Sequence, residues 1–65
     1  MKTYRFYFLN AENRIAGPAR EIACADDVAA ASIATDLLEA NSESFAIEIW
    51  DADRLVGTHQ RTARS

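Results

Sequence analysis

The sequence has few of the residues that usually stabilise or activate very small proteins. Its 65 residues include one cysteine, Cys24, and one histidine, His59. A single cysteine cannot form a disulfide within the chain, and one cysteine with one histidine cannot supply the four ligands of a Cys/His zinc site. A chain of this length buries only about 60% of the surface that its unfolded form exposes. Its stability therefore has to come from a dense core or from self-association.

The sequence also lacks a long apolar run and a surplus of positive charge. No segment approaches the roughly 20 apolar residues of a membrane span. Arg5 interrupts the apolar N-terminal stretch, which argues against a signal peptide. Seven basic and ten acidic side chains give a net charge of −3, which is unusual for a binder of nucleic acid or of anionic membranes. These features predict a cytoplasmic protein that contacts no membrane.

The two glycines, Gly17 and Gly57, do not belong to a phosphate-binding loop. Neither a GxGxxG nor a GxxxxGK pattern occurs, and there is no nucleophile elbow. So short a chain also offers little room for a pocket of several hundred Å³. The sequence therefore predicts no catalytic residues, no metal, no cofactor and no enzymatic activity.

What the sequence does contain is a pattern of strands and turns within a single domain that spans residues 1–65. Residues 3–9 and 45–50 are rich in aromatic and β-branched side chains, which indicates strands. Turns at 10–13 and 51–53 lead into two further strands, at 14–22 and 54–59. Gly17-Pro18 marks residues 14–22 as an edge strand with a bulge or kink, because proline cannot donate to a sheet ladder. Residues 61–65 lack apolar side chains and are predicted to form a frayed tail.

An amphipathic helix is predicted over residues 25–40. Apolar side chains recur there at helical spacing: Ala30, Ile33, Ala34, Leu37 and Leu38. Asp26 and Asp27 stand in the first turn, where carboxylates cap free amides and complement the helix dipole. The predicted fold is α+β, in the order ββαββ. Two hairpins form a four-stranded antiparallel sheet, with the helix packed on one face and the first and third strands in the centre.

This pattern resembles a family of small uncharacterised proteins that are common in alphaproteobacteria and are grouped as a domain of unknown function. The resemblance is carried by three parts of the chain: the aromatic strand from Tyr4 to Phe8, the helix residues Asp27, Ala30, Ala34 and Leu37, and the run from Ile47 to Val56. Many relatives carry glycine in the hairpin turns, where this chain has Asn13 and Asp53. The resemblance implies a bacterial cytoplasmic ββαββ protein and implies no activity.

Four groups of residues invite a chemical interpretation, and each has a simpler structural one. Cys24 stands near the helix N-terminus, where a thiol pKa can fall, but the neighbouring aspartates oppose ionisation and a buried cysteine is common. His59 has no evident companion for general-base chemistry. Asp26 with Asp27 is explained by capping, and Asp51 with Asp53 by turn formation. Asp51-x-Asp53 lacks the glycine and distal glutamate of a calcium loop.

Arg5 among neighbouring aromatic residues invites an RNA-binding interpretation, since bases can stack on exposed aromatic side chains of a sheet. The recognition signature of such sheets is absent, and the net charge is negative. A nucleic-acid-binding regulator remains an alternative. Its contacts would come from five basic side chains: Arg5, Arg14, Arg54, Arg61 and Arg64. A small-molecule sensor with its ligand between the sheet and the helix, or between two copies, is another alternative.

The strand at residues 3–9 carries bulky side chains on both of its faces, but one helix can cover only one face of the sheet. Tyr7, Leu9 and Trp50 are expected to gather on the uncovered face. Exposed apolar patches mark interaction surfaces, and tyrosine and tryptophan are favoured there. The leading prediction is a non-enzymatic interaction or regulatory module. It would form a homodimer through the uncovered face or through a sheet edge, and it could bind another protein.

Overall fold

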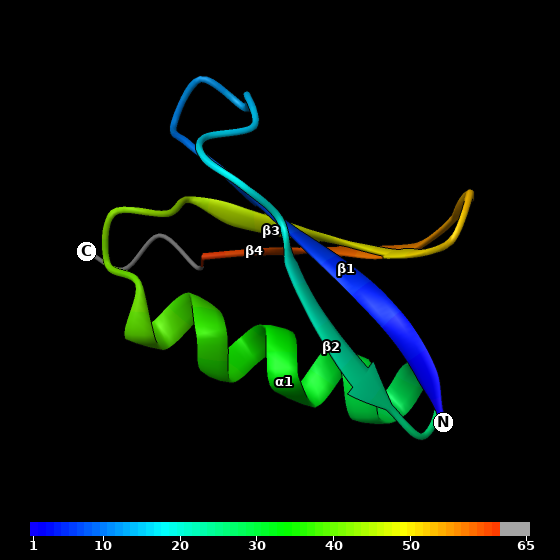
Figure 1. The fold of residues 1–65 in the computed structure, drawn as a ribbon. Coiled ribbons are helices and arrows are strands. Elements are labelled where there is room, and N and C mark those ends of the chain that lie inside the picture. Colours follow the sequence, from blue (N-terminus) through cyan, green and yellow to red (C-terminus); the bar gives the residue numbers. More distant parts are fainter. Residues whose placement is uncertain (62–65) are drawn as a thin grey trace.

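The computed structural model describes residues 1–61 and has the predicted α+β fold (Figure 1). One antiparallel sheet has the strand order β2-β1-β3-β4, and a single helix packs against it. The elements follow the chain in the order β1 (Lys2–Leu9), β2 (Arg20–Cys24), α1 (Asp27–Ala40), β3 (Ala46–Asp51) and β4 (Arg54–Gln60). The prediction that the first and third strands lie in the centre of the sheet is confirmed.

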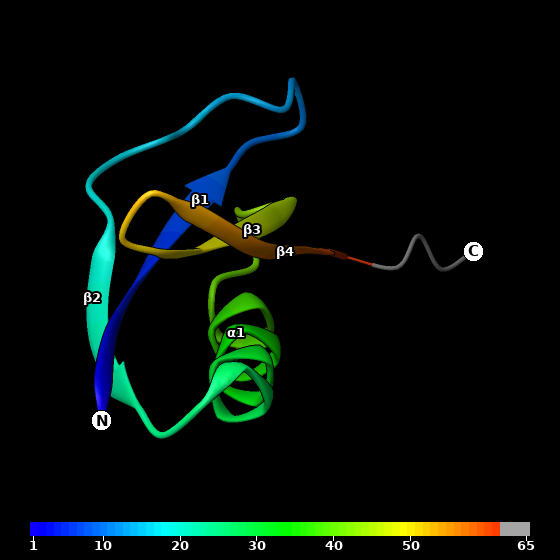
Figure 2. The ribbon, with the colours of Figure 1, turned by 90° about the vertical axis from the view of Figure 1, so that its right-hand side faces the viewer.

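The core lies between α1 and one face of the sheet, and in Figure 2 the helix covers this face alone. The largest fully buried side chains are aromatic or β-branched residues of the central strands, together with one cysteine: Tyr4, Phe6, Ile47, Ile49 and Cys24. The helix contributes Ala30, Ala34 and Leu38 to the same cluster. Two alanines at the contact allow the helix to approach the sheet closely, as the apolar stripe predicts.

The second strand, predicted over residues 14–22 with a bulge or kink at Gly17-Pro18, lies at the sheet edge as expected but is regular only from Arg20 onwards. Regular pairing with β1 begins only at Arg20, which lies opposite Phe6. Before it, a loop keeps a single bridge, between Leu9 and Ile15. Gly17 has φ +88° and Pro18 follows it, so the chain turns away from β1 and cannot extend the ladder there.

The helix begins at Asp27, two residues later than predicted. Asp26 has an extended backbone, and its side chain accepts a hydrogen bond of 2.8 Å from the amide of Ala29. It is therefore the N-cap. At the other end, the backbone amide of Asn41 donates to the carbonyls of Leu37 and Leu38 and closes the helix.

Candidate functional site

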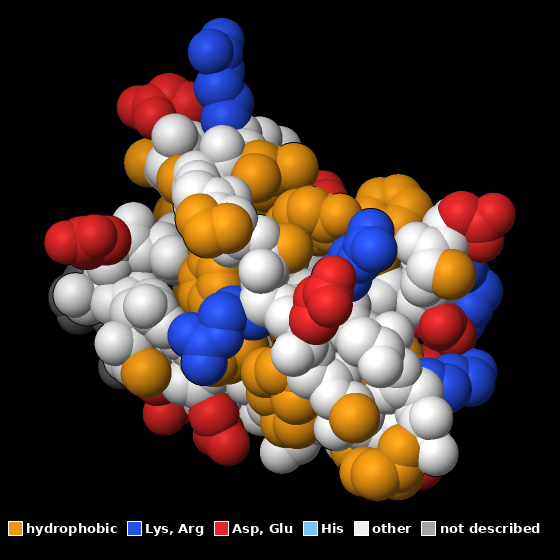
Figure 3. Space-filling model, viewed as in Figure 1, with side chains coloured by type: hydrophobic (Ala, Val, Ile, Leu, Met, Phe, Trp, Pro, Cys, Tyr) orange, Lys and Arg blue, Asp and Glu red, His pale blue; other side chains and the backbone are white. Residues whose placement is uncertain are grey.

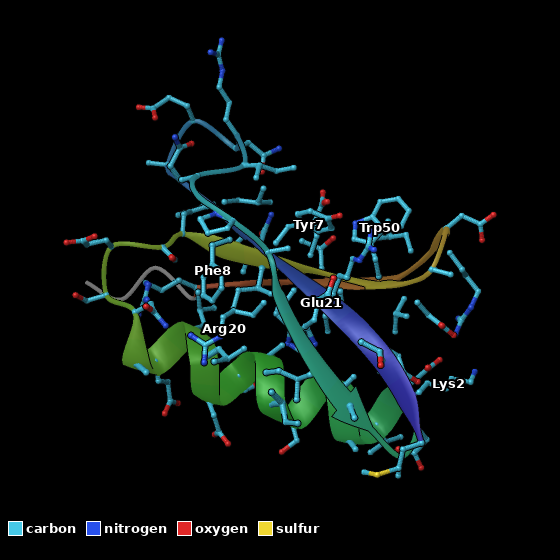
Figure 4. The ribbon with its side chains drawn as sticks, in the orientation of Figure 1. Lys2, Tyr7, Phe8, Arg20, Glu21 and Trp50 are labelled. Carbon is cyan, nitrogen blue, oxygen red and sulfur yellow. The ribbon has the colours of Figure 1, made fainter. Side chains whose placement is uncertain are left out.

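The face of the sheet away from α1 is the first candidate surface. We call it the open face and define it by Arg5, Tyr7, Glu48, Trp50 and Leu55. Sheet pairing places Arg5 opposite Trp50 and Tyr7 opposite Glu48 on the two central strands. Tyr7 and Trp50 lie on the side of the sheet opposite to the helix (Figure 4). Both are partly exposed, and Leu55 on β4 is 48% exposed.

Two polar contacts lie on or beside the open face. The indole nitrogen of Trp50 donates to Glu48 Oε1 at 3.1 Å. Arg5 Nε lies 3.3 Å from Glu21 Oε2 on β2. The face therefore offers aromatic surface with one paired arginine, Arg5, and one carboxylate, Glu48, that accepts a hydrogen bond from Trp50 and keeps its negative charge. Such a mixture of aromatic and polar groups is suited to contact with a protein.

The three predicted interface residues do not share one environment. Tyr7 and Trp50 present partly exposed rings on the open face, as predicted. Leu9 lies at the end of β1 and is only 3% exposed. Leu9 forms a β-bridge with Ile15, which lies in the loop of residues 10–19. The carbonyl of Leu9 accepts a hydrogen bond from the amide of Phe45. Leu9 therefore offers almost no surface to a partner.

A second cluster of polar residues joins three elements at the N-terminal end of α1. The hydroxyl of Tyr4 donates to Asp27 Oδ1 at 2.7 Å, although the ring of Tyr4 is fully buried. Arg54 Nη2 lies 3.3 Å from Asp27 Oδ1 and 2.9 Å from Asp51 Oδ2. Lys2 Nζ lies 3.1 Å from the same oxygen of Asp51. The cluster ties the start of β1 and the β3–β4 turn to the helix.

This arrangement shifts the pKa values of its members away from reactive ranges. The hydrogen bond to Asp27, burial and the Asp27 charge together raise the pKa of Tyr4 to about 12. The Tyr4 hydroxyl and Arg54 hold the pKa of the Asp27 carboxyl below its usual value. Arg54 and then Lys2 do the same for Asp51. At neutral pH, then, Tyr4 stays protonated and both carboxylates stay ionised, which favours a structural role over acid–base chemistry.

Cys24 is buried, with 2% exposure, as the last residue of β2. Burial, assisted by the negative charge of Asp26, raises the pKa of its thiol. The thiol is thus neither accessible nor easily ionised, and the structural interpretation of this residue is the better one.

His59 lies beside an open hollow of about 360 Å³ between the C-terminal half of α1 and the end of β4. Its lining includes Thr35, Leu38, Glu39 and Arg61. The short chain predicts little room for a pocket of several hundred Å³, and this hollow is a surface concavity and not an enclosed pocket. Within residues 1–61, no three histidine, cysteine or acidic side chains are grouped so that they could hold a metal ion.

Arg61, which is predicted to belong to a frayed tail, is bonded to the C-terminal end of the helix. Its guanidinium donates to the carbonyls of Leu38, Asn41 and Ser44. The other residues of that predicted tail, 62–65, lie outside the described residues. No sequence signal identifies the partners of Arg61, because they precede it by 17 to 23 positions.

No family model matches the chain, and neither the search of curated proteins nor that of solved structures found a match. The resemblance to the uncharacterised alphaproteobacterial family therefore stays a prediction. Among the described residues, α1 falls short of the length and apolar character that crossing a membrane requires.

Proposed function

We propose that this chain is a non-enzymatic protein-interaction module that acts as a homodimer in the bacterial cytoplasm. The observation that carries the proposal is the open face. The sheet has a helix on one side only, and the opposite side presents the partly exposed rings of Tyr7 and Trp50 from its two central strands. Aromatic side chains that combine apolar area with a polar tip are enriched in protein interfaces.

The charges of the open face support a protein partner over a nucleic acid. Arg5 is paired with Glu21, and Glu48 adds a further negative charge beside Trp50. A phosphate backbone needs unpaired basic side chains, and this face has none to offer. A protein surface can instead pack against the two rings without breaking either polar contact.

The size of the chain supports the homodimer. A single core in a domain of this length supplies only about 3–5 kcal/mol, and association is one of the usual ways in which such small folds gain stability. In the proposal, two copies form the stable unit, and the open faces are the surfaces that the unit presents to other proteins.

Solution mass tests the homodimer directly. Sedimentation equilibrium over a concentration series should give the mass of two chains at high concentration and a reversible decrease towards one chain on dilution. A single-chain mass at every concentration up to high micromolar would contradict the proposal.

A paired substitution tests the open face. Tyr7→Lys should leave both the fold and the dimer mass unchanged, since the ring is partly exposed and outside the core cluster. The same substitution should weaken every protein contact that the wild-type dimer makes through this face. Ser32→Lys, on the exposed side of α1 away from the sheet, is the matched control. Equal binding of a partner by the two variants would exclude the open face as its contact surface.

A further inference from the structure

The two flanks of α1 differ in chemistry. Thr35 and Glu39 line the hollow beside β4, so this flank faces β4 and is polar. Helical geometry places residues at positions 29, 33 and 37 on the other flank, towards β2. These residues are Ala29, Ile33 and Leu37, and all three are only partly buried. The helix thus keeps an apolar flank accessible on the β2 side of the molecule.

The neighbouring strands continue this apolar surface. Ile22 on β2 and Phe8 on β1 are also only partly buried. Regular pairing between the two strands ends at Phe6 and Arg20, so β2 does not extend alongside Phe8. We call the surface made by Phe8, Ile22, Ile33 and Leu37 the β2 seam. Hydrophobic side chains are visible at the surface between β2 and α1 in Figure 3.

The outer edge of β2 carries backbone groups that point away from the sheet. The carbonyl of Phe8 accepts from the amide of Ala16, on the β2 side of β1. Backbone groups alternate in direction along a strand, so the even-numbered residues of β1 bond towards β2. Tyr4 opposite Ile22 is then a hydrogen-bonded pair. It follows that Glu21 and Ala23 direct their amides and carbonyls outwards, where no strand of residues 1–61 pairs with them.

Opposite charges stand at the two ends of β2. Arg20 begins the strand, and its side chain points towards α1 in Figure 4. It makes no ion pair within residues 1–61. Asp26 follows the strand end and caps the helix, and among the same residues it has no basic partner either. Two copies of β2 placed antiparallel therefore bring the positive start of each strand beside the negative end of the other.

From these observations we propose that a second copy of the chain binds along β2, in an antiparallel pairing centred on Ile22. In this register Glu21 of each copy lies opposite Ala23 of the other, and these are the residues whose backbone groups point outwards. Their amides and carbonyls form four hydrogen bonds, the two sheets become one, and the two β2 seams face each other beneath it. Arg20 of each copy comes next to Asp26 of the other.

The other exposed edge fits a second copy less well. Pairing of β4 with β3 shifts register between Ile49 and Trp50, so β4 is irregular near its start. The helix flank beside β4 presents the polar Thr35 and Glu39, whereas the flank beside β2 presents Ile33 and Leu37, so pairing along β4 would bring fewer apolar side chains of the helix together. On the open face Arg5 is already paired with Glu21, so the Glu48 carboxylate would meet no unpaired basic side chain across a two-fold axis.

Two substitutions test the β2 contact by different means. Ala23→Pro removes an outward amide and leaves the bonds of β2 to β1, because edge strands accept proline where the amide faces away from the sheet. Ile33→Lys places a charge in the β2 seam, and Thr35→Lys on the polar flank is its matched control. Sedimentation equilibrium should show a dissociation constant raised roughly 30-fold or more by Ala23→Pro and by Ile33→Lys. Thr35→Lys should leave it unchanged.

A cross-link tests the register without depending on these variants. Residues that face each other in a non-bonded antiparallel pair have Cα atoms about 4.5 Å apart, which a disulfide can span. Ile22→Cys, in a Cys24→Ala background, should therefore form a covalent dimer under mild oxidation. Thr58→Cys in the same background is the control on β4 and should remain monomeric under denaturing electrophoresis.

The inference rests on the proposed homodimer, and the outcomes separate the two. A wild-type chain that is monomeric at all concentrations contradicts both the proposed function and the β2 contact. A wild-type dimer that survives Ala23→Pro and Ile33→Lys, or that gives cross-linking at Thr58 and not at Ile22, overturns the β2 contact alone. Loss of the dimer in folded Ala23→Pro protein, with rapid cross-linking at Ile22, supports it.

Discussion

Replacing Arg61 by alanine should destabilise the fold far more than its position after the last strand implies. The guanidinium donates to three carbonyls, those of Leu38, Asn41 and Ser44. The last turn of α1 contains no basic residue. Arg61 therefore supplies, from outside the helix, a positive charge bonded at the negative end of the helix dipole. A cation at this position and charge-assisted bonds to carbonyls together predict a loss of about 2 kcal/mol in the free energy of unfolding.

This loss is large for so small a domain. If the fold is worth about 3–5 kcal/mol, Arg61→Ala removes a large part of it and should lower the melting temperature by about 10 °C. Arg61→Lys should fall between the wild type and Arg61→Ala, because an ammonium group keeps the charge but cannot offer the planar fork of donors that reaches several carbonyls.

Thermal unfolding followed by circular dichroism measures the effect. All variants need the same protein concentration, because association makes the melting temperature depend on concentration. Arg14→Ala is the control: Arg14 lies in the exposed 10–19 loop, and within residues 1–61 its side chain makes no hydrogen bond or ion pair. If Arg61→Ala and Arg14→Ala melt at the same temperature, the end of α1 does not depend on this guanidinium and the reasoning is refuted.

Three further predictions concern the core, the polar cluster and the thiol. Ile47→Val should lower the free energy of unfolding by about 1 kcal/mol in urea titrations, because Ile47 is fully buried, whereas Ile15→Val, at a position 56% exposed, should change it little. Stability should fall on both sides of neutral pH. The Asp27 contribution is present above the ordinary pKa of 3.8 and is lost as pH falls through the lowered pKa, whereas the Tyr4 contribution is present below 10.0 and is lost as pH rises towards about 12. Urea midpoints across the pH range check both signs. In Asp27→Asn the loss of stability at low pH should be smaller than in the wild type, and an unchanged loss would contradict the role of the Asp27 carboxylate. Finally, Cys24 should react with an alkylating reagent only after unfolding, so rapid labelling of the native protein, measured by mass spectrometry, would contradict its burial and raised pKa.

The elements that the sequence predicts well are those set by local pattern. Bulky residues on both faces of β1 indicate a central strand, and β1 does lie between β2 and β3. The apolar spacing of α1 predicts a stripe of five residues: Ala30, Ala34 and Leu38 enter the core, and Ile33 and Leu37 pack beside it only partly buried. For α1 the period of the side chains determines which face is buried, whereas for β1 the bulk on both faces indicates only that the strand is central.

The features that the sequence could not supply depend on contacts between distant residues. Tyr4 reads as a core aromatic, and nothing in its neighbourhood reveals that its hydroxyl reaches Asp27, 23 positions away. Strand alternation places Leu9 on the open face, but the cover provided by the 10–19 loop depends on how that loop folds back. Ala52 adopts φ 57° in the β3–β4 turn, a conformation that alanine seldom occupies and that composition therefore does not predict.

The distribution of bonded basic side chains bears on the nucleic-acid-binding alternative that the sequence leaves open. Within residues 1–61, four basic side chains are engaged with acidic groups or helix carbonyls: Lys2, Arg5, Arg54 and Arg61. Three of these are among the five arginines on which a nucleic-acid-binding role depends, and Arg64 lies outside the described residues. Arg14 alone cannot provide the cluster of phosphate contacts that such binding needs. Arg20 stands apart because it begins the edge strand β2, its side chain points towards α1, and it makes no ion pair within residues 1–61. In the proposed β2 contact this single charge would lie next to the single carboxylate of Asp26 from a second copy, whereas a phosphate backbone needs several basic side chains together.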